Sequence, residues 1–119
     1  MLIKVNAHYQ DFDIYCGRPM PKRGLKGSPL GNPFKDPWDG RGPIERYRLW
    51  LWDKLKRRDR VVVDELITVI GFNQVHGECR LACWCAPRPC HVDVIIKALQ
   101  TEAVTLILSE EIFKRGIKV

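Results

Sequence analysis

Glycine and proline are concentrated in one stretch of this chain, and that stretch limits what the chain can fold into. Between Gly17 and Pro43, six glycines and six prolines occur within 27 residues. This density breaks any helix or central strand, so we expect a long irregular loop over 17–43. A loop of this length is uncommon inside a compact domain unless it serves as a lid or binding loop, although a mobile surface loop fits the composition equally well. Regular structure must therefore come from the residues on either side.

Apolar residues recur at spacings of three and four after this loop, which predicts helices. The first begins at Pro43 and runs to about Arg58. The second is capped by Asp59 and ended by Gly71. A third follows Cys90 and is amphipathic, and a short basic helix is expected at the tail.

Short apolar runs predict strands over 2–6, 12–16, 79–85 and 103–108. The first two are expected as a hairpin or as neighbours in one sheet. A strand, a turn, a helix and a strand follow one another from residue 79, and this order implies a right-handed crossover. We therefore expect one α/β domain over residues 1–119, with a small Rossmann-like, partly parallel sheet, flanking helices and the long Gly/Pro-rich loop.

The cysteines form the most informative motif. Four of the five occur within twelve residues, and the segment from Cys83 to His91 reads C-x-C-x4-C-H where a strand is expected to turn into a helix. Four such ligands could hold a tetrahedral zinc ion: Cys83, Cys85, Cys90 and His91. The spacing differs from that of the common C-x2-C zinc ribbons, so zinc is one interpretation among several.

A second interpretation uses the start of the helix after Cys90. A helix N-terminus favours anions and lowers the pKa of a thiol placed there. Cys90 is then a candidate thiolate, His91 an acid or base, and Arg88 a source of positive charge in the turn, with Asp93 or His91 as proton carrier. The structural alternative is that the cysteines pack in the core and His91 caps the helix. A Cys85–Cys90 disulfide fits the spacing but is disfavoured in a reducing compartment.

Positive charge belongs to the first half of the chain. The net charge is +6. Residues 1–60 carry 14 basic and 7 acidic side chains, whereas residues 61–119 carry 6 and 7. A basic 41–60 helix, basic loop residues and three tryptophans could bind nucleic acid or a host protein; the loop and aromatic residues are Lys22, Arg23, Lys26, Trp38, Trp50 and Trp52. A solvated helix face and core tryptophans explain the same pattern.

The compartment is inferred from what the sequence lacks. No apolar run approaches the roughly 20 residues of a membrane-spanning helix, and the first residues lack the apolar block of a signal peptide. The clustered, odd-numbered cysteines do not fit a secreted disulfide framework. We expect a cytoplasmic protein that does not act at membranes.

Four ordered motifs resemble one protein family. They are 14–18 (IYCGR), 28–34 (SPLGNPF), Tyr47 with Trp50 and Leu51, and 81–94 (LACWCAPRPCHVDV). Together they resemble domain-of-unknown-function family 4326, over roughly residues 12–96. The resemblance implies a compact α/β domain, found in bacteria and phages, in which a Gly-Arg turn, a Gly-Asn-Pro-Phe loop and a Cys-His turn meet. It implies no activity.

These features lead to two functional hypotheses. In the first, the three turns bind a nucleotide or another phosphorylated small molecule, and any enzyme activity would be hydrolysis or group transfer on it. Arg18 would contact phosphate, and the loop would hold the base or sugar; the ligand-binding candidates are Gly17, Arg18, Gly31, Asn32, Pro33, Phe34 and Arg88. Arg18 could equally be a surface charge, and Asn32 a turn residue bonded to its own backbone. In the second, the chain is a basic nucleic-acid-binding or host-protein-binding effector, with or without structural zinc.

Overall fold

Three short strands form one parallel sheet. The computed structural model describes residues 1–34 and 41–116. Within them lie β1 (Leu2–Asn6), β2 (Ile14–Tyr15) and β3 (Cys79–Cys83). The order is β1-β3-β2, and β3 pairs in parallel with both neighbours. The first two strands belong to one sheet, but they form neither the hairpin nor the neighbouring pair that we expected. β3 is the most buried strand and takes the central place between them.

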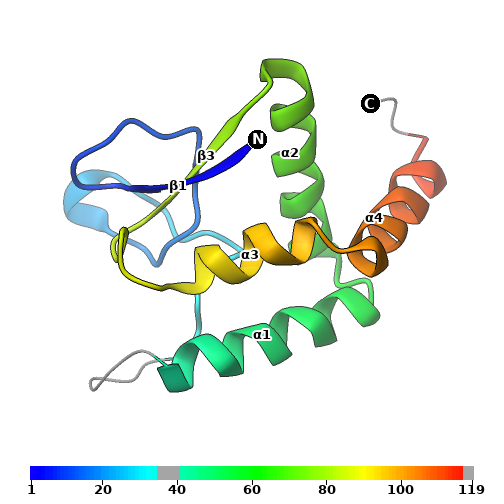
Figure 1. The fold of residues 1–119 in the computed structure, drawn as a ribbon, viewed down its shortest axis with the longest axis horizontal. Helices are drawn as coiled ribbons and strands as arrows, with labels where there is room; N and C mark the ends of the chain where they lie inside the picture. Colours follow the sequence, from blue (N-terminus) through cyan, green and yellow to red (C-terminus); the bar gives the residue numbers. More distant parts are fainter. Residues whose placement is uncertain (35–40, 117–119) are drawn as a thin grey trace.

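Four helices, among the described residues, pack around this sheet. They are α1 (Arg41–Lys56), α2 (Arg60–His76), α3 (His91–Leu99) and α4 (Glu102–Lys114). The helices α2 and α3 contact β3, α1 lies alongside α3, and α4 contacts α2 (Figure 1). The α/β class is therefore confirmed, with a sheet that is parallel throughout; the likeness to Rossmann-type domains stays a prediction.

The expected strand over 103–108 is wrong, because these residues belong to α4. The Thr101 hydroxyl accepts a hydrogen bond from the backbone N–H of Val104 and caps the helix. Val104, Ile107 and Leu108 are buried at helical spacing. A run of β-branched and apolar residues is typical of a strand, but here the Thr101 cap and the buried apolar face stabilise a helix. The crossover that we expected from 79–85 to 103–108 is therefore absent, and the parallel connections run through α1 and α2 instead.

The expected end of the second helix at Gly71 is also wrong. The helix α2 continues through Gly71 to His76, and Gly77 ends it with a φ of 79°. Asp59 does cap this helix, since its carboxylate accepts from the backbone N–H of Val62 at 3.1 Å. A glycine within a helix weakens it without breaking it, whereas a positive φ requires one.

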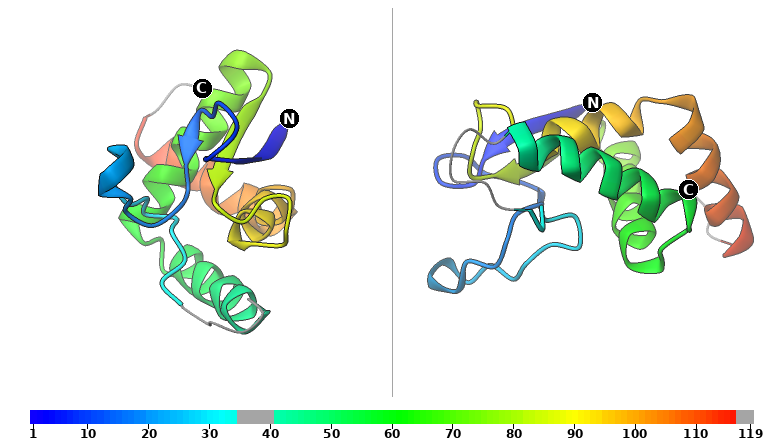
Figure 2. Two further views of the ribbon diagram at one scale, coloured as in Figure 1. Left: turned by 90° about the vertical axis from the view of Figure 1, so that its left-hand side faces the viewer. Right: turned by 90° about the horizontal axis from the view of Figure 1, so that it is seen from below.

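The Gly/Pro-rich loop is more ordered than we expected. Its described part contains a 3-10 helix, η1 (Pro21–Arg23), and a bridge between Met20 and Leu25. The region around η1 projects away from the sheet (Figure 2). Residues 35–40, which include Trp38, lie outside the described residues, and helix α1 already begins at Arg41 rather than at Pro43.

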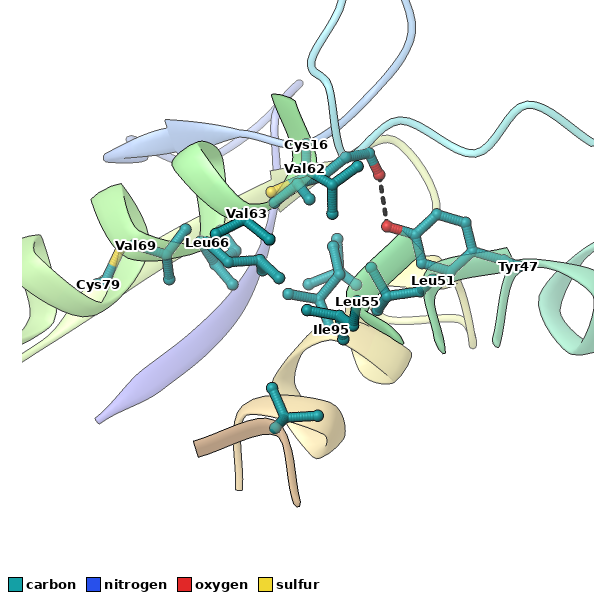
Figure 3. Packing of buried hydrophobic residues seen from close by; sticks show 14 of the residues in the cluster. Cys16, Tyr47, Leu51, Leu55, Val62, Val63, Leu66, Val69, Cys79 and Ile95 are labelled. Atoms are coloured by element: carbon teal, nitrogen blue, oxygen red, sulfur yellow. Dashed lines mark hydrogen bonds between the residues drawn. The ribbon is translucent and has the colours of Figure 1, made fainter. Parts of the chain in front are cut away.

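A continuous apolar core joins the loop to the helices. Cys16, Leu30, Tyr47, Val63 and Ile95 are fully buried within it. The Tyr47 hydroxyl donates a hydrogen bond of 2.7 Å to the Leu30 carbonyl, which fixes the loop to α1 (Figure 3). In the part of the chain that the structure describes, no helix is long and apolar enough to cross a membrane.

Candidate functional site

A pocket of about 710 Å³ lies beside the carboxyl end of β3. The turn after β2, the end of the 17–34 loop, the start of α1 and the turn between β3 and α3 border it. Eight residues that the sequence predicted as site residues line it: Gly17, Arg18, Asn32, Phe34, Cys83, Cys85, Cys90 and His91. The other predicted residues, Gly31, Pro33, Arg88 and Asp93, are not among the lining residues. The carboxyl end of a parallel strand is where open α/β sheets bind ligands.

Sequence reasoning missed five lining residues: Met20, Pro43, Ile44, Trp84 and Pro89. They are mostly apolar and provide the body of the pocket rather than its polar groups. Ile44 lies in α1, and Trp84 directly follows β3. Only the relative placement of α1 and β3 brings them to one cavity.

The Gly17 turn owes its shape to Tyr15. A Cβ on Gly17 would lie 2.6 Å from Cζ of the Tyr15 ring, so any larger residue would require that ring to move. The Tyr15 hydroxyl donates to the Arg18 carbonyl and accepts from the Trp84 indole N–H. This hydrogen-bond relay links the turn after β2 to the turn between β3 and α3, which we call the cysteine turn.

Arg18 holds the loop against this turn. Its Nε donates to the Asn32 carbonyl at 3.0 Å, and one terminal nitrogen donates to the Phe34 carbonyl at 2.6 Å. A guanidinium carries more N–H donors than these two bonds use, so Arg18 retains donors for an anion. Arg18 is exposed at the rim, where a ligand can reach it.

Asn32 has both ends of its amide engaged within the protein. Its Oδ1 accepts from the backbone N–H of Phe34 at 2.9 Å, and its Nδ2 donates to the Pro43 carbonyl at 3.3 Å. This is the turn geometry that we weighed as the alternative to a ligand contact. Asn32 therefore shapes the loop and presents Phe34 to the pocket.

Cys83 and Cys90 form a close pair of free thiols. Cys83 ends β3 and Cys90 caps α3, and their sulfurs are 3.0 Å apart. Both residues are buried, with exposed fractions of 1% and 3%. Cys85 is exposed and lies outside this pair.

The two thiols share one proton unequally. The hydrogen bond from Cys90, the backbone N–H groups of Cys85 and Ala86, and the charge of Lys4 lower the pKa of Cys83 to about 6, against the opposing effect of burial. The hydrogen bond to Cys83 and burial raise the pKa of Cys90. One of our interpretations was that the helix N-terminus makes Cys90 the thiolate. Instead, the charge is stabilised on Cys83, at the end of the strand.

His91 faces the pocket from the first turn of α3. Its Nε2–H donates to the Cys16 carbonyl, and its ring packs edge-on against Tyr47 with centroids 5.1 Å apart. Burial lowers the pKa of His91, so the ring is neutral near pH 7. With Nε2 as the donor, Nδ1 is the acceptor.

Comparison with known protein families identifies the chain. The profile described as Domain of unknown function (DUF4326) matches residues 3–101. The chain belongs to the DUF4326 family. The match extends from the second residue of β1 to the residue before α4, so it includes nearly all of the sheet and every lining residue of the pocket. No curated protein and no solved structure matches the chain.

Two polar residues of β1 brace the cysteine turn of this DUF4326 domain. Lys4 donates to the Arg88 carbonyl at 3.0 Å and forms an ion pair with Asp93 at 2.9 Å. Asn6 donates to the Ala86 carbonyl at 2.7 Å. We did not predict this role. The available signal was the alternation of polar and apolar residues in LIKVN, which places Lys4 and Asn6 on one face.

Asp93 is engaged by this brace rather than by the pocket. Its carboxylate accepts from Lys4 and, at 3.0 Å, from the backbone N–H of Cys90. It thus satisfies and neutralises the N-terminus of α3. Its role as proton carrier stays a prediction.

The four predicted zinc ligands are not gathered around one point. Within residues 1–34 and 41–116, no group of three or more His, Cys, Asp or Glu side chains is placed to hold a metal ion. The Nε2 of His91 is directed to a backbone carbonyl, and Cys85 is exposed. Zinc binding by the DUF4326 domain stays a prediction that needs these side chains to rearrange.

The basic 41–60 region is largely neutralised by its own acidic neighbours. Five ion pairs involve its cations: Arg48–Glu45, Arg57–Asp53, Lys54–Asp59, Arg58–Glu110 and Arg60–Asp64. Trp50 packs against the core, and Trp52 is exposed by 39%. This pairing favours the interpretation of a solvated helix face. Binding of nucleic acid or a host protein stays a prediction.

Proposed function

We propose that the pocket beside β3 binds a nucleotide or a similar phosphorylated small molecule. One observation carries the proposal: the Gly-Arg turn, the Gly-Asn-Pro-Phe loop and the Cys-His turn, which lie far apart in the sequence, border a single pocket. Its volume of about 710 Å³ lies within the range that small-molecule sites occupy. An apolar wall with a few polar groups is also typical of such sites.

Arg18 is the proposed phosphate contact. It sits at the rim, is exposed, and retains N–H donors after its two bonds to the loop. Arginine binds phosphate through charge-assisted hydrogen bonds. The N-terminus of α3 is the weaker candidate, because Asp93 already occupies the Cys90 N–H and brings a negative charge.

Phe34 and the apolar wall are the proposed contacts for the base. Phe34 is only partly buried and faces the pocket, and Trp84 lies across the same cavity. An aromatic face stacks on any base and adds about 1–3 kcal/mol. If the ligand is processed, neutral His91 is the group best placed to take a proton. Hydrolysis or group transfer on the ligand remains a prediction.

The test compares nucleotides with the matching nucleosides. Binding to the wild type is measured by calorimetry for both members of each pair, and we expect the phosphate to strengthen binding. An ionic hydrogen bond contributes about 2 kcal/mol, or roughly thirtyfold in affinity. Arg18→Gln should remove most of this phosphate increment, because the increment depends on the guanidinium.

Arg46→Gln is the matched control, since Arg46 is exposed on α1 and does not line the pocket. It should leave both affinities unchanged. Equal losses for nucleoside and nucleotide in Arg18→Gln would mean that Arg18 only supports the loop. Failure of every nucleotide to bind the wild type would overturn the proposal. Single-stranded DNA that binds with a steep salt dependence would favour the nucleic-acid hypothesis instead.

A further inference from the structure

We propose that Cys83 and Cys90 form a dithiol redox site that a small hydroperoxide oxidises to a Cys83–Cys90 disulfide. Cys83 is the attacking sulfur and Cys90 is the sulfur that closes the bond. The proposal concerns the pocket's chemistry toward oxidants and is independent of nucleotide binding.

The position of the two sulfurs carries the inference. They lie 3.0 Å apart, whereas a disulfide bond is about 2.05 Å long, so closure requires an approach of about 1 Å. Small rotations of two cysteine side chains can supply this. The other cysteines are placed differently: Cys16 and Cys79 lie in the core, and Cys85 is exposed.

The surrounding turn keeps the pair in register. Cys83 ends the central strand and Cys90 begins α3, and Asn6 and Lys4 bind the backbone between them. The sulfurs meet because β1 holds both ends of the turn. A core packing role alone does not need two sulfurs closer than ordinary contact.

The limited solvent exposure of the two sulfurs restricts which oxidants can reach them. Cys83 and Cys90 both line the pocket, yet their exposed fractions are only 1% and 3%. A hydroperoxide is small enough to reach a sulfur through the pocket, whereas a protein disulfide is not. A thiolate is the reactive form toward such oxidants. The backbone N–H groups of Cys85 and Ala86, together with Lys4, favour the charged form of Cys83.

The chemistry balances without a further reactant. The Cys83 thiolate attacks one oxygen of the hydroperoxide: an S–O bond forms, the O–O bond breaks, and the departing oxygen takes a proton and leaves as an alcohol or water. The Cys90 sulfur then attacks the sulfenic acid of Cys83. An S–S bond forms, the S–O bond breaks, and the hydroxide leaves as water with the proton from Cys90. The dithiol loses two electrons and the peroxide gains them.

The first experiment uses the unmodified chain. Reduced protein is treated with equimolar hydrogen peroxide near pH 7, and its intact mass and free thiols are measured. We expect the loss of two hydrogen atoms and a fall from five free thiols to three, both reversed by dithiothreitol. A digest that cleaves after Trp84 leaves Cys83 on one peptide and Cys85 with Cys90 on the next, so a link between the two peptides shows that Cys83 is bonded, and the Cys85→Ser variant below decides its partner.

Single substitutions assign the two roles. Cys90→Ser should stop at a sulfenic acid on Cys83 that dimedone traps. Cys83→Ser should react slowly and form no disulfide. Cys85→Ser decides between pairings, and the proposal requires it to form the disulfide as the wild type does. Circular dichroism and melting curves show whether each variant is folded. If a variant does not fold, the peroxide experiment on the wild type still tests the proposal.

Several results would overturn the proposal. They are an unchanged thiol count after peroxide treatment, a disulfide that includes Cys85, and trapping of a sulfenic acid on Cys90 rather than on Cys83. Oxidation that continues to sulfinic acid in the wild type would show that Cys90 does not intercept Cys83.

Discussion

Gly17 and Gly71 are the same residue type in opposite surroundings. A Cβ on Gly17 would overlap the Tyr15 ring, whereas a Cβ on Gly71 meets no atom within 4 Å. Gly71 also lies inside α2, where alanine has the higher helix propensity. The effect of adding one methyl group should therefore change sign between these positions.

We predict that Gly17→Ala destabilises the fold by about 1–3 kcal/mol through overpacking. Gly71→Ala should stabilise it by roughly 0.5–1 kcal/mol. Urea denaturation of both variants measures the two changes in the free energy of unfolding. A Gly17→Ala variant as stable as the wild type would mean that the Tyr15 ring can move aside, and that the relay to Trp84 is not rigid.

Cys83 gives a prediction that depends on pH. Its pKa is lowered from 9.0 to about 6, so we expect the thiolate form at pH 7 and its protonation as the pH falls through about 6. The titratable groups that interact with it are Lys4, Cys90, Cys85 and Cys16, and Lys4 is itself paired with Asp93.

The thiolate should be visible in the ultraviolet spectrum. We expect the absorbance of one thiolate per chain at pH 7, lost with a midpoint of about 6. Cys83→Ser should lose this signal. Cys90→Ala removes the hydrogen bond and should move the midpoint toward 9.0. An unshifted midpoint in Cys90→Ala would contradict the shared proton.

At the scale of elements, local pattern predicted the helices better than the strands. Capping residues and the spacing of apolar residues located α1, α2 and α3. These signals, such as the Asp59 cap, the buried apolar stripe and the Cys90 turn, depend only on residues a few positions apart. The strand predicted over 103–108 was wrong because β-branched residues occur in helices as well as in strands. The Thr101 cap and the packing of α4 decide in favour of the helix. The parallel order β1-β3-β2 depends on contacts between residues more than 60 apart, such as Leu2 with Cys79. No local pattern encodes them.

The loop and α1 are joined by the hydrogen bond from Tyr47 to Leu30. We predict that Tyr47→Phe costs about 1–3 kcal/mol, because it leaves a buried carbonyl without a partner. It should also speed tryptic cleavage at loop residues such as Lys22 and Arg23. Tyr9→Phe is the matched control, since Tyr9 is 80% exposed and should change stability by less than about 0.5 kcal/mol. Unchanged cleavage in Tyr47→Phe would show that the loop is held by other contacts.

At the scale of the whole molecule, the candidate site is where three predictions from separate segments meet. Sequence reasoning placed Arg18, Phe34 and His91 in one site through the family motifs, and they do line one pocket. It could not find Lys4, whose role exists only because β1 lies beside β3. Nor could it show that Asn32 and Asp93 are occupied by internal hydrogen bonds.

The most direct test of the proposed function is a map of backbone amide chemical shifts while a nucleotide is added to the full chain. The account predicts that the largest changes lie at Gly17, Arg18, Phe34 and His91, with small changes along the exposed face of α1. Saturation at one equivalent would support a single pocket. Changes centred on Arg46 and Lys56, or no changes at all, would contradict it.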